Sequence, residues 1–273
     1  LHRVLFVSTR ARSLNQEIDL RKFSMSSLKA LIFDVDGTLA DTERDGHRIA
    51  FNRAFADSGL DWDWSIDLYG ELLEVAGGKE RIQHYIQTHK AEVPPGEDLE
   101  ALATKIHAAK TEHYQALVKE GIIPLRPGVK RLIEEAKQAG VRLAIATTSR
   151  YENVIALLET ELAPDSPNWF EVIAAGDVVE HKKPAPDVYF YTLEKLNLSA
   201  ADCIAIEDSF QGLQASLASG IKTVVTLNAY TRSQDFTGAA IVIDQLGEPD
   251  QPFEVLKGEV VPTYVDLAML KSL

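Results

Sequence analysis

Two aspartates, two residues apart, follow the first strongly apolar run of the chain. Residues 33–37 read Phe-Asp-Val-Asp-Gly, and the short apolar run at 30–33 is typical of a buried strand. Alternate strand residues point the same way, so Asp34 and Asp36 are expected on one side at the carboxyl end. Carboxylates this close repel unless a cation joins them or one is protonated, which favours a metal-dependent site. Asp-Gly is also a common turn dipeptide, and a solvated turn is the competing interpretation.

Polar side chains also stand at the ends of three later apolar runs. One group offers hydroxyls and backbone N–H groups that suit a phosphate, one is a lysine before a proline, and one is a pair of acids that suits a hard cation. Taken singly, the hydroxyls and the acids fit helix caps equally well, and the lysine fits a solvated charge. These residues are Thr147, Thr148 and Ser149 after 141–146, Lys183 after the run at 172, and Glu207 and Asp208 after 203–206.

Apolar runs of strand length alternate with stretches of helical period over the second half of the chain. This alternation predicts an α/β fold with a parallel sheet covered by helices on both faces. The carboxyl ends of such strands lie on one rim of the sheet, where ligands bind. The predicted strands are 30–33, 141–146, 172–175, 203–206, 223–227 and 240–243, and the predicted helices are 127–140, 151–158, 187–196 and 211–219.

Roughly eighty residues of mainly helical character separate the first strand from the helix near residue 127, too many for one crossover connection. We therefore expect an inserted helical cap domain at 43–124 and a core domain at 28–42 and 125–245. Residues 246–273 lack a clear period and are expected to form a tail on the core. Residues 1–27 are expected to be poorly ordered, either a targeting leader or a start placed too far upstream, and we favour the second.

The 273-residue chain has a formal net charge of −13, which disfavours nucleic acid and anionic membranes as partners. No apolar run reaches the roughly 18 to 20 residues that span a bilayer. The same charge repels a phosphorylated substrate, so a phosphate site requires local cations and a metal ion. We expect a cytoplasmic monomer, or a protein of the plastid stroma if residues 1–27 are the remnant of a transit peptide.

The four motifs resemble, in type and order, those of the haloacid dehalogenase superfamily. The resemblance covers residues 30–243 and implies a Rossmann-like core with a helical cap. It also implies a reaction in which Asp34 attacks phosphorus and becomes an aspartyl-phosphate. Asp36 would protonate the leaving oxygen and then deprotonate the attacking water. The motifs are Asp34-Val-Asp36-Gly-Thr, Thr147, Lys183 and Glu207-Asp208.

The same resemblance implies one Mg²⁺ ion that stabilises negative charge on the transferring group. Its ligands would be the Asp34 carboxylate, the Asp36 backbone carbonyl and Asp208, with Glu207 acting through water. Three further groups would contact the phosphoryl group or offset its charge. These are the Thr147 hydroxyl with the neighbouring Thr148 and Ser149, the Thr148 amide, and Lys183.

Four segments, at 41–48, 69–73, 77–82 and 125–128, look like the CbbY-type branch of this superfamily. That branch comprises phosphatases of sugar bisphosphates, notably xylulose-1,5-bisphosphate, a misfire product that inhibits Rubisco. A bisphosphate requires a second anion pocket away from the metal, although each candidate residue could equally be an ordinary surface group. The candidates are Lys79 beside Gly78, with Arg81 and Arg126 as helpers, for the second phosphate, and Glu43 and His47 for sugar hydroxyls.

Two alternatives remain. A phosphosugar mutase of the β-phosphoglucomutase kind would share the core, the cap type and the nucleophile, and would differ in the lifetime of the aspartyl-phosphate. A non-catalytic phospho-accepting regulator also pairs acids with Thr and Lys. The large cap and Asp36 argue against the regulator, because a receiver domain needs neither.

Overall fold

The computed structural model describes residues 28–75, 77–258 and 262–273, and the expectation for residues 1–27 lies outside this range. Its centre is a seven-stranded sheet in the order β3-β2-β1-β4-β5-β6-β7. Neighbouring strands from β3 to β6 are parallel, and β7 joins β6 antiparallel at the edge. The strands are β1 (Ala30–Phe33), β2 (Arg142–Ala146), β3 (Phe170–Ala174), β4 (Cys203–Glu207), β5 (Lys222–Thr226), β6 (Ile241–Ile243) and β7 (Val255–Lys257).

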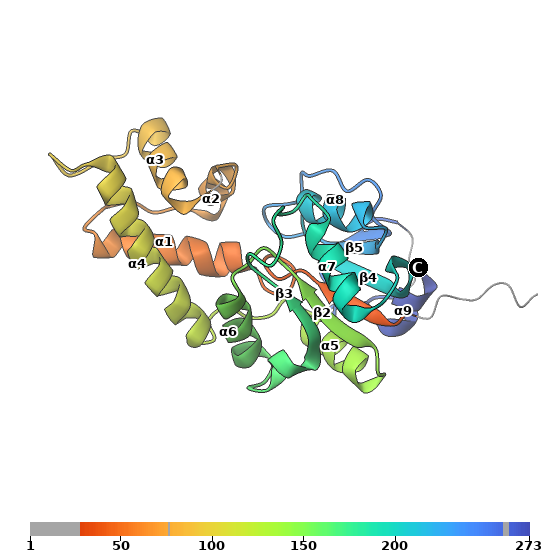
Figure 1. The fold of residues 1–273 in the computed structure, drawn as a ribbon. Helices are drawn as coiled ribbons and strands as arrows, with labels where there is room; N and C mark the ends of the chain where they lie inside the picture. Colours follow the sequence, from red (N-terminus) through yellow and green to blue (C-terminus); the bar gives the residue numbers. More distant parts are fainter. Residues whose placement is uncertain (1–27, 76, 259–261) are drawn as a thin grey trace, which may run out of the picture.

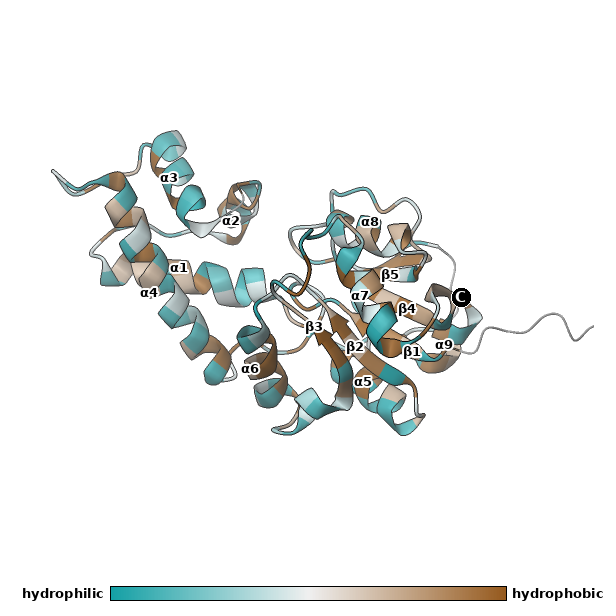
Figure 2. Ribbon diagram, viewed as in Figure 1, coloured by the Kyte–Doolittle hydropathy of each residue, from teal (hydrophilic) through white to brown (hydrophobic). Residues whose placement is uncertain are grey.

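Helices cover both faces of the sheet, as its continuous apolar strands require. Within β1, Leu31 and Phe33 belong to a core shared with α5, α6 and α9, whereas Ala30 and Ile32 belong to one shared with α7 and α8. Figure 2 shows the central strands as hydrophobic, with hydrophilic residues along the helices around them. These helices are α5 (Val129–Gln138), α6 (Tyr151–Glu161), α7 (Asp187–Leu196), α8 (Phe210–Ala218) and α9 (Leu267–Ser272).

A separate helical unit is inserted after β1 and lies to one side of the sheet in Figure 1. Its own core is aromatic, with Phe51, Phe55 and Trp64 packed at ring-centroid distances of 4.7 to 6.0 Å. The chain enters and leaves this cap side by side, because Ala40 and Leu125 pair as an antiparallel bridge. The cap consists of a π-helical turn, η2 (Thr42–His47), and of α1 (Arg48–Asp57), α2 (Ile66–Leu72), α3 (Gly78–His89) and α4 (Leu99–Lys119).

The C-terminal stretch is more regular than its sequence indicates. Residues 246–273 were expected to be a tail without period, yet they contain β7 and α9. Val265, Leu267 and Leu270 are buried in the same core as α5. These two elements are too short for a hydrophobic period to emerge, so the sequence carries no signal for them. Among the described residues, no helix combines the length and apolar character that crossing a membrane requires.

Candidate active site

The strand register places the first aspartate beside the acidic pair. Phe33 of β1 is level with Ile206 of β4 and with Ile145 of β2. The residues that follow, Asp34, Glu207 and the turn at Thr147, therefore emerge together at the carboxyl rim of the sheet. The order β2-β1-β4 makes this the point where successive crossover connections run in opposite directions, which is where open α/β sheets bind ligands.

Lys183 joins Asp34 to Glu207 in a buried ion-pair network. Its Nζ donates to Asp34 Oδ1 at 2.7 Å, to Glu207 Oε1 at 2.6 Å and to the Ala146 carbonyl at 2.9 Å. Burial alone would lower the pKa of Lys183, but the two carboxylates outweigh it and the pKa is raised. Burial raises the pKa of Asp34 to about 7, against the opposing effect of Lys183. The lysine thus holds a positive charge beside the Asp34 carboxylate.

Acidic side chains outnumber the lysine at this rim. Oxygens of Asp34, Glu207 and Asp208 lie within 4.8 Å of one another, and all three residues are buried. Burial, and then the Asp34 charge, raises the pKa of Asp208 well above its usual value. Among the described residues, Glu207 Oε2 has no hydrogen-bond partner. Three buried carboxylates with one lysine between them suit a divalent cation with a preference for oxygen ligands.

Asp36 stands apart from this cluster and is held as a hydrogen-bond acceptor. Thr42 Oγ1 donates to Asp36 Oδ1 at 2.5 Å, and the Ser149 hydroxyl donates to Oδ2. Thr42 belongs to the first turn of the cap and Ser149 to the core turn after β2. The second aspartate is therefore positioned at the junction of the two domains.

The helix-cap interpretations of the two polar turns do not fit the structure. Helix α6 begins at Tyr151 with Arg150 as its N-cap and no side-chain cap bond, so the hydroxyls at 147–149 are not used there. Helix α8 is capped by Ser209, whose side chain accepts from the Gly212 amide, which leaves the acids at 207 and 208 free of that role. Thr147 is buried, Thr148 is exposed and Ser149 is half-buried. The Ser149 hydroxyl is bonded to Asp36, whereas the sequence placed it on phosphate.

Two polar residues of the rim were missed by sequence reasoning. Tyr189 of α7 donates its hydroxyl to Glu207 Oε1, and Asn228 in the loop after β5 donates to Asp208 Oδ2 at 2.6 Å. Gly37 has φ +84°, and a Cβ there would overlap both Asp208 and Asn228. Only long-range pairing brings these groups together, because Tyr189 reads as one apolar position of a helix and Asn228 as a loop residue.

In the cap, the two residues expected at sugar hydroxyls face other cap side chains. Glu43 Oε2 accepts from the Tyr69 hydroxyl at 2.6 Å. His47 stacks on Tyr114 at 3.9 Å, and its Nδ1 lies 2.9 Å from Lys110 Nζ. Burial, and then the Lys110 charge, lowers the pKa of His47 to about 3. A neutral ring that accepts from Lys110 at Nδ1 carries its proton on Nε2, which can donate to a hydroxyl.

The cationic residues expected to bind a second phosphate differ in whether other groups of the protein already pair with them. Lys79 is exposed, and no described residue pairs with it. Gly78 lies against His107, where a Cβ would come within 2.5 Å of the ring. Arg81 is used within the cap, since it donates to the carbonyls of Leu72 and Val75 and to Tyr69.

Arg126 has its partners in the core. Its side chain is buried in the core, and its guanidinium donates to the backbone carbonyls of Gly37, Thr226, Leu227 and Asp244. The remaining Nε lies 3.5 Å from Asp41. Both terminal nitrogens are thus engaged by core carbonyls, and Arg126 ties core loops together in this structure. The sequence could not reveal this, because its partners are carbonyls of distant loops.

Lys110 of α4 is the cation that the sequence did not single out. Besides His47, its Nζ lies over the rings of Phe51 at 5.1 Å and Tyr114 at 5.5 Å. No carboxylate within the described ranges forms an ion pair with it. Burial lowers its pKa to about 8, while Glu43 and Asp36 act in the opposite direction.

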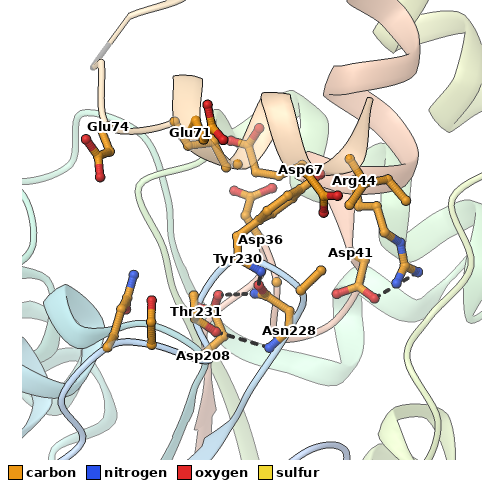
Figure 3. A pocket seen from close by; sticks show the side chains of 18 of the residues that line it. Asp36, Asp41, Arg44, Asp67, Glu71, Glu74, Asp208, Asn228, Tyr230 and Thr231 are labelled. Atoms are coloured by element: carbon orange, nitrogen blue, oxygen red, sulfur yellow. Dashed lines mark hydrogen bonds and ion pairs between the residues drawn. The ribbon is translucent and has the colours of Figure 1, made fainter. Parts of the chain in front are cut away.

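A cavity of about 710 Å³ lies between the cap and the core rim. Figure 3 shows Asp36 and Asp208 within it, Asp67, Glu71 and Glu74 on the cap side, and Asn228 and Tyr230 from the loop after β5. Arg44 is the basic residue of its lining, and it is paired with Asp41 and Asp45. The cavity is therefore acidic, and the unpaired cations Lys79 and Lys110 are not part of its lining.

The structure combines an α/β core with an inserted helical cap. At the rim of the core, Asp34 is paired with a buried lysine and lies beside an acidic cluster. These features define a hydrolase of the haloacid dehalogenase class. The model of the haloacid dehalogenase-like hydrolases matches residues 28–220, and the chain belongs to that family and, within it, to the branch of CbbY proteins. This confirms the resemblance seen in the sequence.

Individual relatives support this placement. The plasmid-encoded CbbY of Cupriavidus necator is 48% identical over 245 residues, covering 90% of this chain and 96% of the relative. A mutant CbbY of Rhodobacter sphaeroides, solved with xylulose-(1,5)bisphosphate, is 44% identical with a TM-score of 0.65, covering 80% of this chain and 94% of that one. A putative β-phosphoglucomutase of Thermotoga maritima is 26% identical with a TM-score of 0.62, covering 78% and 93%.

The protein is an enzyme, a phosphatase. The fold class expected from the sequence is confirmed by the parallel sheet and by these matches. A non-catalytic phospho-accepting regulator is not consistent with membership of a hydrolase family.

Proposed function

We propose that this protein hydrolyses a sugar bisphosphate, best represented by xylulose-1,5-bisphosphate, with Mg²⁺ and through an aspartyl-phosphate on Asp34. The observation that carries the proposal is the buried Asp34–Lys183–Glu207 network beside Asp208. A relative of 44% identity binds this bisphosphate, which supports the choice of substrate. The domain division at 43 and 124 is part of the proposal, with the cap contributing the residues that select the sugar.

In the first step, an Asp34 oxygen forms a bond to phosphorus while the bond to the sugar oxygen breaks. Asp36 gives its proton to that leaving oxygen. In the second step, Asp36 takes a proton from water, the water oxygen bonds to phosphorus, and inorganic phosphate leaves Asp34. The hydroxyls of Thr42 and Ser149 hold the Asp36 carboxylate at the junction of cap and core. Thr147 and the Thr148 amide hold the phosphoryl oxygens.

The acidic cluster is the proposed magnesium site. Asp34, Asp208 and the Asp36 backbone carbonyl would hold the ion, and Glu207 would act through water. The unpartnered Glu207 Oε2 and the raised pKa of Asp208, caused first by burial, both fit a bound cation. When bound, Mg²⁺ supplies electrostatic stabilisation of the negative charge that develops on the phosphoryl group.

The second phosphate requires cations that the protein does not already use. Lys79 at the start of α3 and Lys110 on α4 meet this condition, whereas Arg81 and Arg126 donate to carbonyls elsewhere. Glu43 and the Nε2–H of His47, whose Nδ1 lies beside Lys110, would bind the sugar hydroxyls. A dianion between Lys79 and Lys110 would be held away from the metal, as a bisphosphate needs.

A panel of sugar mono- and bisphosphates, assayed with Mg²⁺ for released phosphate and for product identity, tests the proposal. Xylulose-1,5-bisphosphate should be cleaved best, and β-glucose 1-phosphate should not be converted to its 6-phosphate isomer. Conversion to the isomer would establish a mutase instead. The Asp34→Asn variant should lose turnover on every substrate while remaining folded, and residual turnover would remove the nucleophile assignment.

A further inference from the structure

Each carboxylate of the acidic cluster is held through one oxygen. Asp34 Oδ1 accepts from Lys183, Glu207 Oε1 from Lys183 and Tyr189, and Asp208 Oδ2 from Asn228. Within the described part of the chain, no donor reaches Asp34 Oδ2, Glu207 Oε2 or Asp208 Oδ1. One oxygen of every acid is therefore anchored and the other accepts no hydrogen bond from the described residues, with Glu207 Oε2 buried against Gly212.

Tyr189 is a fixed anchor for Glu207. Its ring is fully buried between α7 and the sheet, packed with Val188 and Leu193 in the same core. Burial, and then Glu207, raises the pKa of Tyr189 well above its usual value, so the phenol remains a donor. A buried tyrosine needs a partner for its hydroxyl, and the carboxylate is the one it has.

Asn228 is oriented by its own loop. Its backbone N–H donates to Thr231 Oγ1 at 3.1 Å, and its Oδ1 accepts from the Tyr230 N–H at 2.8 Å. With Oδ1 engaged in this way, Nδ2 is directed at Asp208 Oδ2 at 2.6 Å. The loop continues through Tyr230 to the cap, where that ring packs on Tyr69 at 5.9 Å.

We propose that Tyr189 and Asn228 are positioning residues that set the affinity of this site for a divalent cation, an inference that rests on the proposed magnesium-dependent function. Each donor fixes one oxygen of an acid and so presents the other at a constant place. Partners of this kind commonly change metal affinity about 10- to 100-fold when removed. Neither residue touches the reacting atoms.

Calorimetric titration of metal-free protein with Mg²⁺ tests this inference. Tyr189→Phe, which removes one oxygen atom, should weaken Mg²⁺ binding about 10- to 100-fold. Asn228→Leu should do the same from the other side of the cluster. Tyr191→Phe is the matched control, because this tyrosine lies on the same helix and its hydroxyl contacts none of the three acids. The activity of both test variants should recover at high Mg²⁺.

The possible outcomes distinguish a failure of this inference from a failure of the proposed magnesium dependence. If the native protein binds Mg²⁺ and both folded variants bind it equally well, with only a lower Tm, the two residues serve packing alone and the inference is wrong. If the native protein binds no Mg²⁺, the proposed metal dependence itself fails. Should Asn228→Leu not fold, as judged by circular dichroism, the near-isosteric Tyr189→Phe decides alone.

Discussion

Lys110 is a half-buried lysine that forms no ion pair with any carboxylate of the described residues. This half-buried ammonium has no carboxylate partner, so in direct contact only His47 and two aromatic rings offset its desolvation, and its pKa of about 8 reflects first of all that burial. The protein has 41 aspartates and glutamates against 28 lysines and arginines, so a lysine without a carboxylate partner in this position is not explained by a shortage of acids. A phosphate arriving with the substrate would provide the missing partner.

Lys110→Met should therefore reduce the preference for bisphosphates. We expect the ratio of kcat/KM for xylulose-1,5-bisphosphate to that for para-nitrophenyl phosphate to fall about 10- to 200-fold, equivalent to roughly 1.4 to 3 kcal/mol for a charge-assisted hydrogen bond. Lys105→Met, an exposed lysine on the same helix, is the control. An unchanged ratio in Lys110→Met would remove this residue from the second phosphate site.

The same lysine predicts a pH dependence. Lys110 is charged below a pH of about 8 and neutral above it, so kcat/KM for a bisphosphate should fall as the pH rises through 8. The groups that modulate this step are Glu43 and Asp36, which raise the pKa, and Arg81 and Arg150, which lower it. The descending limb should be absent for para-nitrophenyl phosphate, and its persistence in Lys110→Met would assign it to another group.

At the scale of elements, the loops at the carboxyl rim are held in place by Arg126. Its guanidinium joins the turn after β1 to the loops after β5 and β6 through their carbonyls. These loops carry Asp36, Asn228 and the cap entrance, so the arginine aligns the pieces of the site.

Arg126→Met should consequently reduce stability and leave substrate preference alone. Several buried carbonyls would lose a charged donor, and we expect the free energy of unfolding to drop by about 3 kcal/mol or more. Urea unfolding measures this loss, and the bisphosphate-to-aryl-phosphate ratio of the remaining folded enzyme should match that of the native protein. A loss of kcat/KM for bisphosphates alone would indicate that Arg126 binds the substrate.

At the scale of the whole molecule, like charges converge where the two domains meet. The rim places three carboxylates together, and the cavity beneath the cap adds further acids. Both features favour a bound cation over an empty site, because a cation offsets repulsion that folding alone leaves uncompensated.

Mg²⁺ should therefore stabilise the folded protein. At a concentration 100 times its Kd, a ligand that binds only the native state contributes about 2.7 kcal/mol, which corresponds to a Tm increase of roughly 5 to 10 °C for a chain of this size. Scanning calorimetry with Mg²⁺ and with EDTA measures the difference. EDTA should also abolish turnover. Asp208→Asn is the comparison variant, and an equal shift in it would place the ion elsewhere.

The local sequence was sufficient for the core motifs because they lie at strand ends. Asp34, Thr147 and Glu207 each follow an apolar run, and parallel strands bring their carboxyl ends to one rim whatever the loops do. Strand positions were correct within a few residues for the same reason. The resemblance to a known family added the roles of these residues, which spacing alone does not supply.

Other features depended on the tertiary structure because they are pairings between residues distant in sequence. Lys110 meets His47 across 63 positions, and Arg126 meets the loop after β5 across about a hundred. The role of a cationic side chain depends on the group it pairs with. The sequence therefore could not show that Lys110 has no carboxylate partner, or that Arg126 donates to backbone carbonyls. The acids at the rim can be predicted from the sequence because each follows directly on a strand. The cap cations differ only in their partners, and those partners are brought to them by tertiary packing.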